Sequence, residues 1–206
     1  MNANQEMRKK KSTFREYTEA ILIALVLAFI IRSFLVQAFK IPSGSMIPTL
    51  LVGDHILVNK FVFGPQVPFT KYRLFSFQKP KRGQVVVFLE PTDRKKDFIK
   101  RVIGLPGETI QVINRKVHIN GEPLKEADYA YYTNPRYVRG LDNHGPLKIP
   151  EDCYFMMGDN RENSSDSRVW GPVPFELIKG KAFVIYWSWD GPHKSVRWRR
   201  IADLIH

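Results

Sequence analysis

The sequence predicts a mainly β protein preceded by one N-terminal transmembrane helix. Three observations lead to this fold class. An unbroken apolar run covers residues 20–31 and follows a group of basic residues. Short segments rich in β-branched and aromatic residues come after it, as expected of strands. The 13 glycines and 14 prolines are scattered between these segments, as turns in a β-rich chain would be.

The first element is the apolar run, which is long enough to cross a membrane because a helix needs about 20 residues to do so. We predict a basic tail over residues 1–16 and an anchor over 17–38. A cleavable leader has the same pattern, but the bulky residues of 34–37 leave no small-x-small cleavage site. A buried core helix is the other alternative, and it would have to be apolar on every side.

The basic residues that precede this anchor predict its orientation in the membrane. The net charge of +12 favours an anionic partner, either a phospholipid surface or nucleic acid. Five cations precede the apolar run: Arg8, Lys9, Lys10, Lys11 and Arg15. They favour the membrane over nucleic acid and place the N-terminus in the cytoplasm, with everything after residue 39 on the trans side. A second basic cluster, at residues 194–200, fits either a solvated edge or contact with lipid headgroups.

The remaining elements are short strands and turns. Strands are predicted at 54–60, 84–89, 97–103, 109–113, 116–119, 154–157 and 182–187. Residues 39–112 and 150–206 form the expected core, and the irregular residues 113–149 form an inserted lobe. A short helix near 174–177 is the one helix expected after the anchor. The single cysteine, Cys153, excludes an intramolecular disulfide and is expected to be a small buried hydrophobe.

Residues 41–50 form the first segment that suggests chemistry. If the backbone is extended, Ser43 and Ser45 share one face, and Gly44 between them permits a close backbone approach. This arrangement suits a nucleophile with a second hydroxyl beside it. An ordinary turn of serine, glycine and proline is the alternative.

Residues 97–107 form the second segment. On a strand, Lys100 shares a face with Phe98 and Val102, and an apolar face desolvates the lysine amine and lowers its pKa. A lysine with a pKa of about 7–8 could activate a serine hydroxyl, whereas an ordinary lysine is protonated at neutral pH. A surface lysine beside Arg101 is the alternative.

Residues 158–171 form the third segment, a polar loop entered from an apolar strand. Asp166 and Arg168 are natural ion-pair partners, and the Ser164 hydroxyl could orient an amine. A calcium loop is the alternative, but the acidic residues lack EF-hand spacing and Arg161 would repel a cation.

Other catalytic and cofactor motifs are absent from the sequence. It has five histidines but no Gly-x-Ser-x-Gly elbow, so a histidine triad through His144 is only a minor alternative. We find no phosphate-binding loop, dinucleotide fingerprint or Cys/His metal set, and we expect no metal and no cofactor.

These three segments, in this order behind an anchor, resemble the bacterial type I signal peptidase family over residues 20–190. The resemblance implies that Ser45 is the nucleophile and Lys100 the general base. It implies that Ser43 joins the Ser45 N–H in an oxyanion hole and that Ser164 holds the lysine amine. It also implies that Asp166 and Arg168 form an ion pair that supports the site. Five residues fall where the family lines its apolar pockets: Phe39, Ile41, Met46, Leu50 and Ile99.

The resemblance also implies a membrane-bound endopeptidase that removes N-terminal signal peptides from preproteins exported by the Sec and Tat routes. The substrate would lie as a strand between residues 40–43 and 97–100, with alanine one and three positions before the cut. The expected location is the bacterial inner membrane, with anionic phospholipid and no nucleic acid as partners. The cysteine pair of some members is missing, and Glu162 stands where aspartate is often found.

Three rival hypotheses remain. Self-cleaving repressors of the Ser/Lys type and pilus-processing peptidases share the expected core, but the anchor argues against the repressors and the complete third segment argues against both. The third rival is an inactive, basic, membrane-tethered binding module. It would be unaffected by Ser45→Ala, and its binding would weaken steeply with salt.

Overall fold

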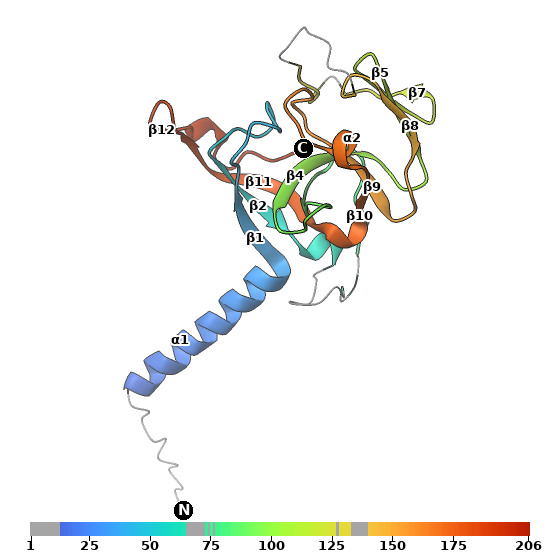
Figure 1. Cartoon of the computed structure of the whole chain (residues 1–206). Helices are drawn as coiled ribbons and strands as arrows, with labels where there is room; N and C mark the ends of the chain where they lie inside the picture. The colour runs from blue at the N-terminus through green and yellow to red at the C-terminus, as the bar shows by residue number, and fades with distance from the viewer. Residues whose placement is uncertain (1–12, 65–72, 74, 76, 127, 133–139) are drawn as a thin grey trace, which may run out of the picture.

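The computed structural model describes residues 13–64, 73, 75, 77–126, 128–132 and 140–206. It shows an N-terminal helix that projects from a β domain (Figure 1). Four of the five predicted topology cations, at positions 8–11, lie outside the described residues. The mainly β fold with one long apolar helix confirms the predicted fold class.

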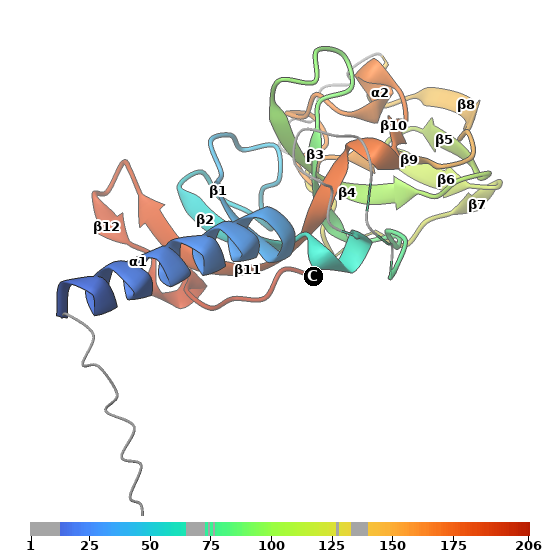
Figure 2. The same cartoon turned by 90° about the horizontal axis from the view of Figure 1, so that it is seen from below.

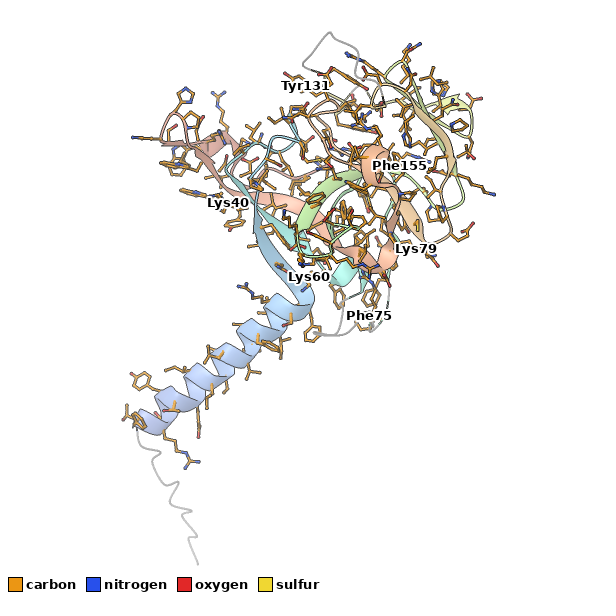
Figure 3. All side chains as sticks on the ribbon, viewed as in Figure 1. Lys40, Lys60, Phe75, Lys79, Tyr131 and Phe155 are labelled. Atoms are coloured by element: carbon orange, nitrogen blue, oxygen red, sulfur yellow. The ribbon has the colours of Figure 1, made fainter. Side chains whose placement is uncertain are left out.

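The N-terminal helix α1 covers Thr13–Ile30 and continues into a π-helical turn at Ile31–Leu35. None of its residues is buried, and Thr13–Leu35 is long and apolar enough to cross a membrane. Its side chains point outward on all sides (Figure 3). The helix ends at Leu35, before the predicted end at residue 38, because Val36 already pairs with Asn59 as a strand.

The main sheet is antiparallel and follows the order β1-β2-β11-β3-β4-β9-β10. Its strands are β1 (Val36–Lys40), β2 (Asp54–Asn59), β11 (Ile178–Asp190), β3 (Val85–Leu89), β4 (Asp97–Gly104), β9 (Cys153–Met157) and β10 (Val173–Pro174). The short β12 (Ser195–Val196) pairs with β11. The register of β11 against β2 shifts twice, and such bulges increase the local bend and twist of a strand.

Two apolar clusters cover the opposite faces of this sheet. On β3, Val85 and Val87 belong to the first cluster, which also includes Met46, Leu50 and Ile205. Val86 and Phe88 point to the other face and pack with Tyr154 and Met156. Burial on both faces explains why Val85–Leu89 is continuously apolar rather than alternating.

A second sheet follows the order β7-β6-β5-β8 and lies at the end of the domain far from α1 (Figures 1 and 2). Its strands are β5 (Thr109–Ile113), β6 (Lys116–Ile119), β7 (Glu122–Pro123) and β8 (His144–Lys148). A third apolar cluster joins Ile110 and Val117 of this sheet to Phe155 and Met157 of β9. Cys153 lies half-buried at the edge of this cluster, less enclosed than predicted.

The short helices complete the described chain. The short helix predicted near 174–177 is the 3-10 helix η3 (Phe175–Leu177), and η2 (Phe61–Phe63) and η4 (Trp198–Arg200) are further 3-10 helices. The short α2 (Ser167–Trp170) was not predicted. It begins where the Asp166 carboxylate accepts a hydrogen bond from the Arg168 N–H.

Candidate active site

Ser45 lies in a loop between β1 and β2, which we call the nucleophile loop (residues 41–53). Its two ends are joined by hydrogen bonds from Ile41 N to Asp54 O (2.8 Å) and from Gly53 N to Ile41 O (3.0 Å). Within the loop the backbone turns, with Leu50 N donating to Met46 O (2.8 Å). The structure therefore positions Ser45 on a closed, tightly turned loop.

The backbone at Ser43 and Ser45 is turned rather than extended, with Ile47 N donating to Gly44 O at 3.2 Å, although both serines line one cavity. Ser45 is buried whereas Ser43 is exposed. The predicted close approach is also at a different glycine. A Cβ atom on Gly44 would meet the flexible end of Ile47 at 2.9 Å, but one on Gly158 would lie 2.5 Å from the main-chain oxygen of Ser45. Gly158 is thus the position that lets the third segment contact the nucleophile loop.

Lys100 lies on β4 and reaches the serine. Its Nζ atom is 2.7 Å from Ser45 Oγ and donates to the main-chain oxygen of Ile99 at 3.1 Å. The Phe98 ring lies beside the amine, with 5.6 Å between Nζ and the ring centroid. The Lys100 side chain is only 5% exposed, and burial lowers its pKa from 10.5 to about 8. A serine hydroxyl and a lysine with a depressed pKa therefore form a buried pair.

Asp166 and Arg168 form the predicted ion pair, close enough to Lys100 for their charges to affect its pKa. Arg168 donates to both oxygens of the Asp166 carboxylate, at 2.9 and 2.8 Å, and both residues are buried. Burial alone raises the pKa of Asp166, but the hydrogen bonds and charge of Arg168 and the Gly158 N–H outweigh it, so the pKa lies below its ordinary value. Asp166 therefore stays ionised and fixes the backbone at Gly158.

Ser164 lies close to Ser45, because both contact the same side of Gly158. Its Oγ atom is buried and has no hydrogen-bond partner of normal geometry among the described residues. The structure thus brings Ser164 to the site without showing the predicted bond to the lysine amine.

The structure adds Arg101 and Asp159, whose roles the sequence did not reveal. They form a buried ion pair, with hydrogen bonds of 2.8 and 2.7 Å. Thr49 Oγ1 donates to Asp159 at 2.5 Å and accepts from Arg101 at 3.1 Å. This cluster joins the nucleophile loop to the strand that carries Lys100.

Asn160 is a further contact that sequence reasoning missed. Its main-chain N–H donates to Ser45 O at 3.1 Å and its side-chain amide donates to Gly44 O at 3.2 Å. The signal available in the sequence was its place beside Asp159 in the polar segment, but only the fold shows that this segment crosses the nucleophile loop.

A cavity of about 520 Å³ opens onto the pair, lined by Pro42, Ser43, Ser45, Ile99, Lys100 and other residues. A larger hollow of about 810 Å³ lies on the other side of Ile41 and Pro42 and contains neither Ser45 nor Lys100. The Ser45–Lys100 pair is therefore accessible from the smaller cavity.

The five predicted pocket residues divide between these surroundings. Ile99 lines the smaller cavity, Ile41 lines the larger one, and Phe39 packs half-buried against the first apolar cluster. Met46 and Leu50 have no exposed surface, so in this structure they support the nucleophile loop from below instead of lining a pocket.

The chain matches a known protein family over most of its length. The family model described as "Signal peptidase, peptidase S26" matches residues 14–187. The chain belongs to this signal peptidase family.

Several relatives named signal peptidase I agree with the assignment. The protein from Pseudomonas fluorescens is 38% identical, over 92% of this chain and 78% of its own length. The relative from Leptolyngbya laminosa is 40% identical, over 87% of this chain and 82% of its own. A crystal structure of a signal peptidase I from Enterococcus faecalis matches with a TM-score of 0.42 and 32% identity, over 50% of this chain and 97% of that chain.

As a member of the signal peptidase family the chain is a serine endopeptidase, and its apolar helix fits a membrane anchor. The histidine alternative finds no support in the geometry. The ring of His144 packs against Phe155, with 5.5 Å between centroids, and burial lowers its pKa. The hydrogen bond of the Ser45 side chain is made with Lys100 instead.

Proposed function

We propose that this protein is a membrane-anchored endopeptidase that removes signal peptides from exported preproteins, with Ser45 as nucleophile and Lys100 as general base. The observation that supports it most directly is the 2.7 Å separation of Lys100 Nζ and Ser45 Oγ in a buried setting. Hydrogen-bond distance is what proton transfer from a serine to its base requires.

The reaction begins when neutral Lys100 removes the proton of Ser45 Oγ as Oγ bonds to the scissile carbonyl carbon. The Ser45 N–H donates to no acceptor within the described part of the chain, so it can donate to the oxyanion. We propose the exposed Ser43 hydroxyl as the second donor, and one such donor is typically worth about 3–4 kcal/mol. Lys100 then gives its proton to the leaving amine. Water, activated by the same lysine, hydrolyses the serine ester that remains.

We assign supporting roles to three residues. The buried Ser164 hydroxyl has no hydrogen-bond partner of normal geometry among the described residues, and we propose that it orients the lysine amine during the reaction. Asp166 and Arg168 hold the segment that carries it.

The substrate is proposed to lie as an extended strand between residues 40–43 and 97–100, which border the smaller cavity. Small side chains, such as alanine one and three positions before the cut, suit the space beside Pro42 and Ile99. Ile41, Phe39, Met46 and Leu50 act behind these contacts as packing. Apolar pockets discriminate by only about 1–3 kcal/mol per methylene, so membrane placement of the substrate supplies further selectivity.

For the cell, we propose a single-pass protein of the bacterial inner membrane. The N-terminus is cytoplasmic, and the peptidase domain faces the trans side, where Sec and Tat substrates emerge. The basic residues of the chain suit an anionic phospholipid surface. We further propose that residues 39–112 and 150–206 act as the peptidase core and 113–149 as the inserted lobe.

The test is cleavage of a preprotein with an Ala-x-Ala site by the detergent-solubilised full chain. Wild type should cut after the second alanine, and Ser45→Ala and Lys100→Ala should each abolish the cut. Lys116→Ala, at an exposed position of β6, and Ser195→Ala, at an exposed position of β12, are the matched controls and should retain activity. Full activity in either dyad variant would refute the mechanism, and salt-sensitive binding without cleavage would favour the binding module.

A further inference from the structure

We propose that Arg200 is a positioning residue for the reaction, which holds the nucleophile loop at the distance from Lys100 that proton transfer needs. The inference rests on the proposed function and deepens it. Arg200 lies in η4, beyond residues 14–187 that the family model matches, so the family assignment says nothing of it.

The contacts of Arg200 reach the nucleophile loop directly. Its Nη2 donates to the main-chain oxygen of Thr49 at 2.8 Å and to Asp54 Oδ2 at 2.7 Å, and its Nε donates to Asp54 Oδ1 at 3.2 Å. The guanidinium therefore bridges the loop at Thr49 to the first residue of β2.

The Asp54 carboxylate, to which Arg200 binds, is itself held in place by further hydrogen bonds. The residue has no exposed surface, and its carboxylate also accepts from Leu51 N at 2.8 Å and from Ser188 Oγ at 2.6 Å. A buried carboxylate with this many donors is held in one orientation, since loss of any donor would leave a buried charge poorly satisfied.

Thr49 is the point at which the loop meets the strand of the general base. Arg200 holds its main-chain oxygen, while Arg101 and Asp159 hold its side chain. Arg101 directly follows Lys100 on β4. Displacing the Thr49 backbone would therefore shift the loop against the strand and alter the separation of Ser45 from Lys100.

The segment that carries Arg200 is itself firmly attached. Ala202 N donates to Ile185 O at 2.8 Å, and Ile185 N donates to Asp203 O at 2.9 Å. Ile205 is buried in the same apolar cluster as Met46 and Leu50 of the nucleophile loop. Arg101 Nη1 also donates to the main-chain oxygen of His206 at 2.6 Å. Residues 200–206 thus form a brace between β11, the nucleophile loop and β4.

The chemistry of the side chain suggests the decisive variant. Arginine presents a rigid fork that bonds Thr49 O and Asp54 together, whereas lysine offers one flexible ammonium group. Arg200→Lys keeps the charge beside Asp54 but cannot reproduce both contacts. Arg82→Lys is the matched control, because the Arg82 side chain is about as exposed as that of Arg200, pairs with a carboxylate and donates to a main-chain oxygen, that of Ile103.

The experiment measures steady-state cleavage and thermal melting of both variants in the full chain. A misplacement of about 1 Å can cost roughly 100-fold in rate, so Arg200→Lys should lower kcat about 10- to 100-fold with KM within about twofold of wild type. Both variants should melt at similar temperatures, and Arg82→Lys should keep its kcat. If kcat is unchanged in Arg200→Lys, or falls only as the folded fraction falls, the proposal is wrong.

Two further measurements keep the proposal testable. Amide hydrogen exchange should become faster in residues 46–53 of Arg200→Lys and stay unchanged in β5 and β6, and uniform exchange would overturn it. If Arg200→Lys does not fold, Ser188→Ala loosens Asp54 without changing Arg200 and should lower kcat at least about threefold, a fraction of the cost of full misplacement. An unchanged kcat in that variant overturns the brace. Cleavage by Ser45→Ala would instead refute the proposed function, independently of the exchange result.

Discussion

The pKa of Lys100 is set by the opposing effects of burial and of nearby charges. Burial lowers it, the carboxylates of Asp166 and Asp159 raise it, and the charge of Arg168 lowers it again. The net result, a fall from 10.5 to about 8, disfavours the protonated amine by roughly 3 kcal/mol. The packing around β4 has to supply that free energy, because a fully solvated lysine would remain protonated and could not act as a base.

The pH dependence of cleavage should report this value directly. Below a pKa of about 8 the neutral form of Lys100 falls tenfold per pH unit, so kcat/KM should rise along an acid limb centred near pH 8. Folding stability should rise with pH between about 8 and 10.5, because the unfolded chain binds more protons there. A pH–rate profile and denaturation at several pH values check both. An acid limb near pH 10 would contradict a depressed base.

The contact of Gly158 with the nucleophile loop gives a second prediction. A Cβ there would lie 2.5 Å from Ser45 O and 2.3 Å from Ser164 Oγ, so Gly158→Ala must push the nucleophile away from its place. We expect a loss of kcat of about 100-fold or more, measured with the same preprotein. Gly191→Ala is the control, because a Cβ at Gly191 meets nothing within 4 Å. Equal activity in the two variants would show that the loop tolerates the shift.

Residue by residue, the sequence was sufficient to single out Ser45, Lys100, Asp166 and Arg168 as candidates, because each type has a distinctive chemistry in its segment, and the structure places them together. It was insufficient for Ser43, since the face of a side chain depends on whether the backbone is extended or turned. Here the backbone turns at residues 44–47, where Ile47 N donates to Gly44 O at 3.2 Å. Thr49 and Arg200 could not be predicted, because their partners are distant in sequence.

At the scale of elements, the Arg101–Asp159 pair holds β4, the nucleophile loop and the third segment together. Removing one partner of a buried ion pair typically costs about 3–5 kcal/mol, so Asp159→Ala should lower the free energy of unfolding by about that amount. Chemical denaturation measures it. Lys79→Ala, which removes an exposed pair with Asp152, should cost at most about 1 kcal/mol. Similar costs for the two variants would show that the buried pair does not stabilise these elements.

The strands themselves were predicted where burial leaves a clear pattern. The starts of β2, β4, β5 and β6 and the ends of β3 and β9 agree with the sequence. The strand β8 was missed because His144–Lys148 contains glycine and proline, which strands usually exclude, and its pairing with β5 overrides that preference. The helix α2 is only four residues long, and its start depends on the cap by Asp166.

At the scale of the molecule, few hydrogen bonds join the N-terminal helix to the β domain in the described part of the chain. The π-helical turn after α1 is joined to the domain by Val36 N, which donates to Ile31 O, and by Lys60, which donates to the main-chain oxygens of Leu35 (2.8 Å) and Arg32 (3.5 Å). Figure 3 shows Lys60 at this junction.

Deleting residues 1–35 should therefore leave the melting temperature of the β domain nearly unchanged. Cleavage of a short soluble peptide should persist, while cleavage of a preprotein in lipid vesicles should fall about tenfold or more as the shared membrane no longer raises the local concentration of enzyme at its substrate. Loss of the folded domain on deletion would show that α1 has a structural role.

The direct passage from helix to strand has one more consequence. The residue after Leu35 is already paired in β1, and Ser45 follows within the next ten positions. An extended chain of ten residues spans at most about 36 Å, and pairing and turns shorten that reach. With α1 fixed in the bilayer, the nucleophile is held at a constant height above the lipid. We therefore expect the enzyme to cut a preprotein whose cleavage site emerges at that height and to spare identical sequences presented nearer to or farther from the membrane.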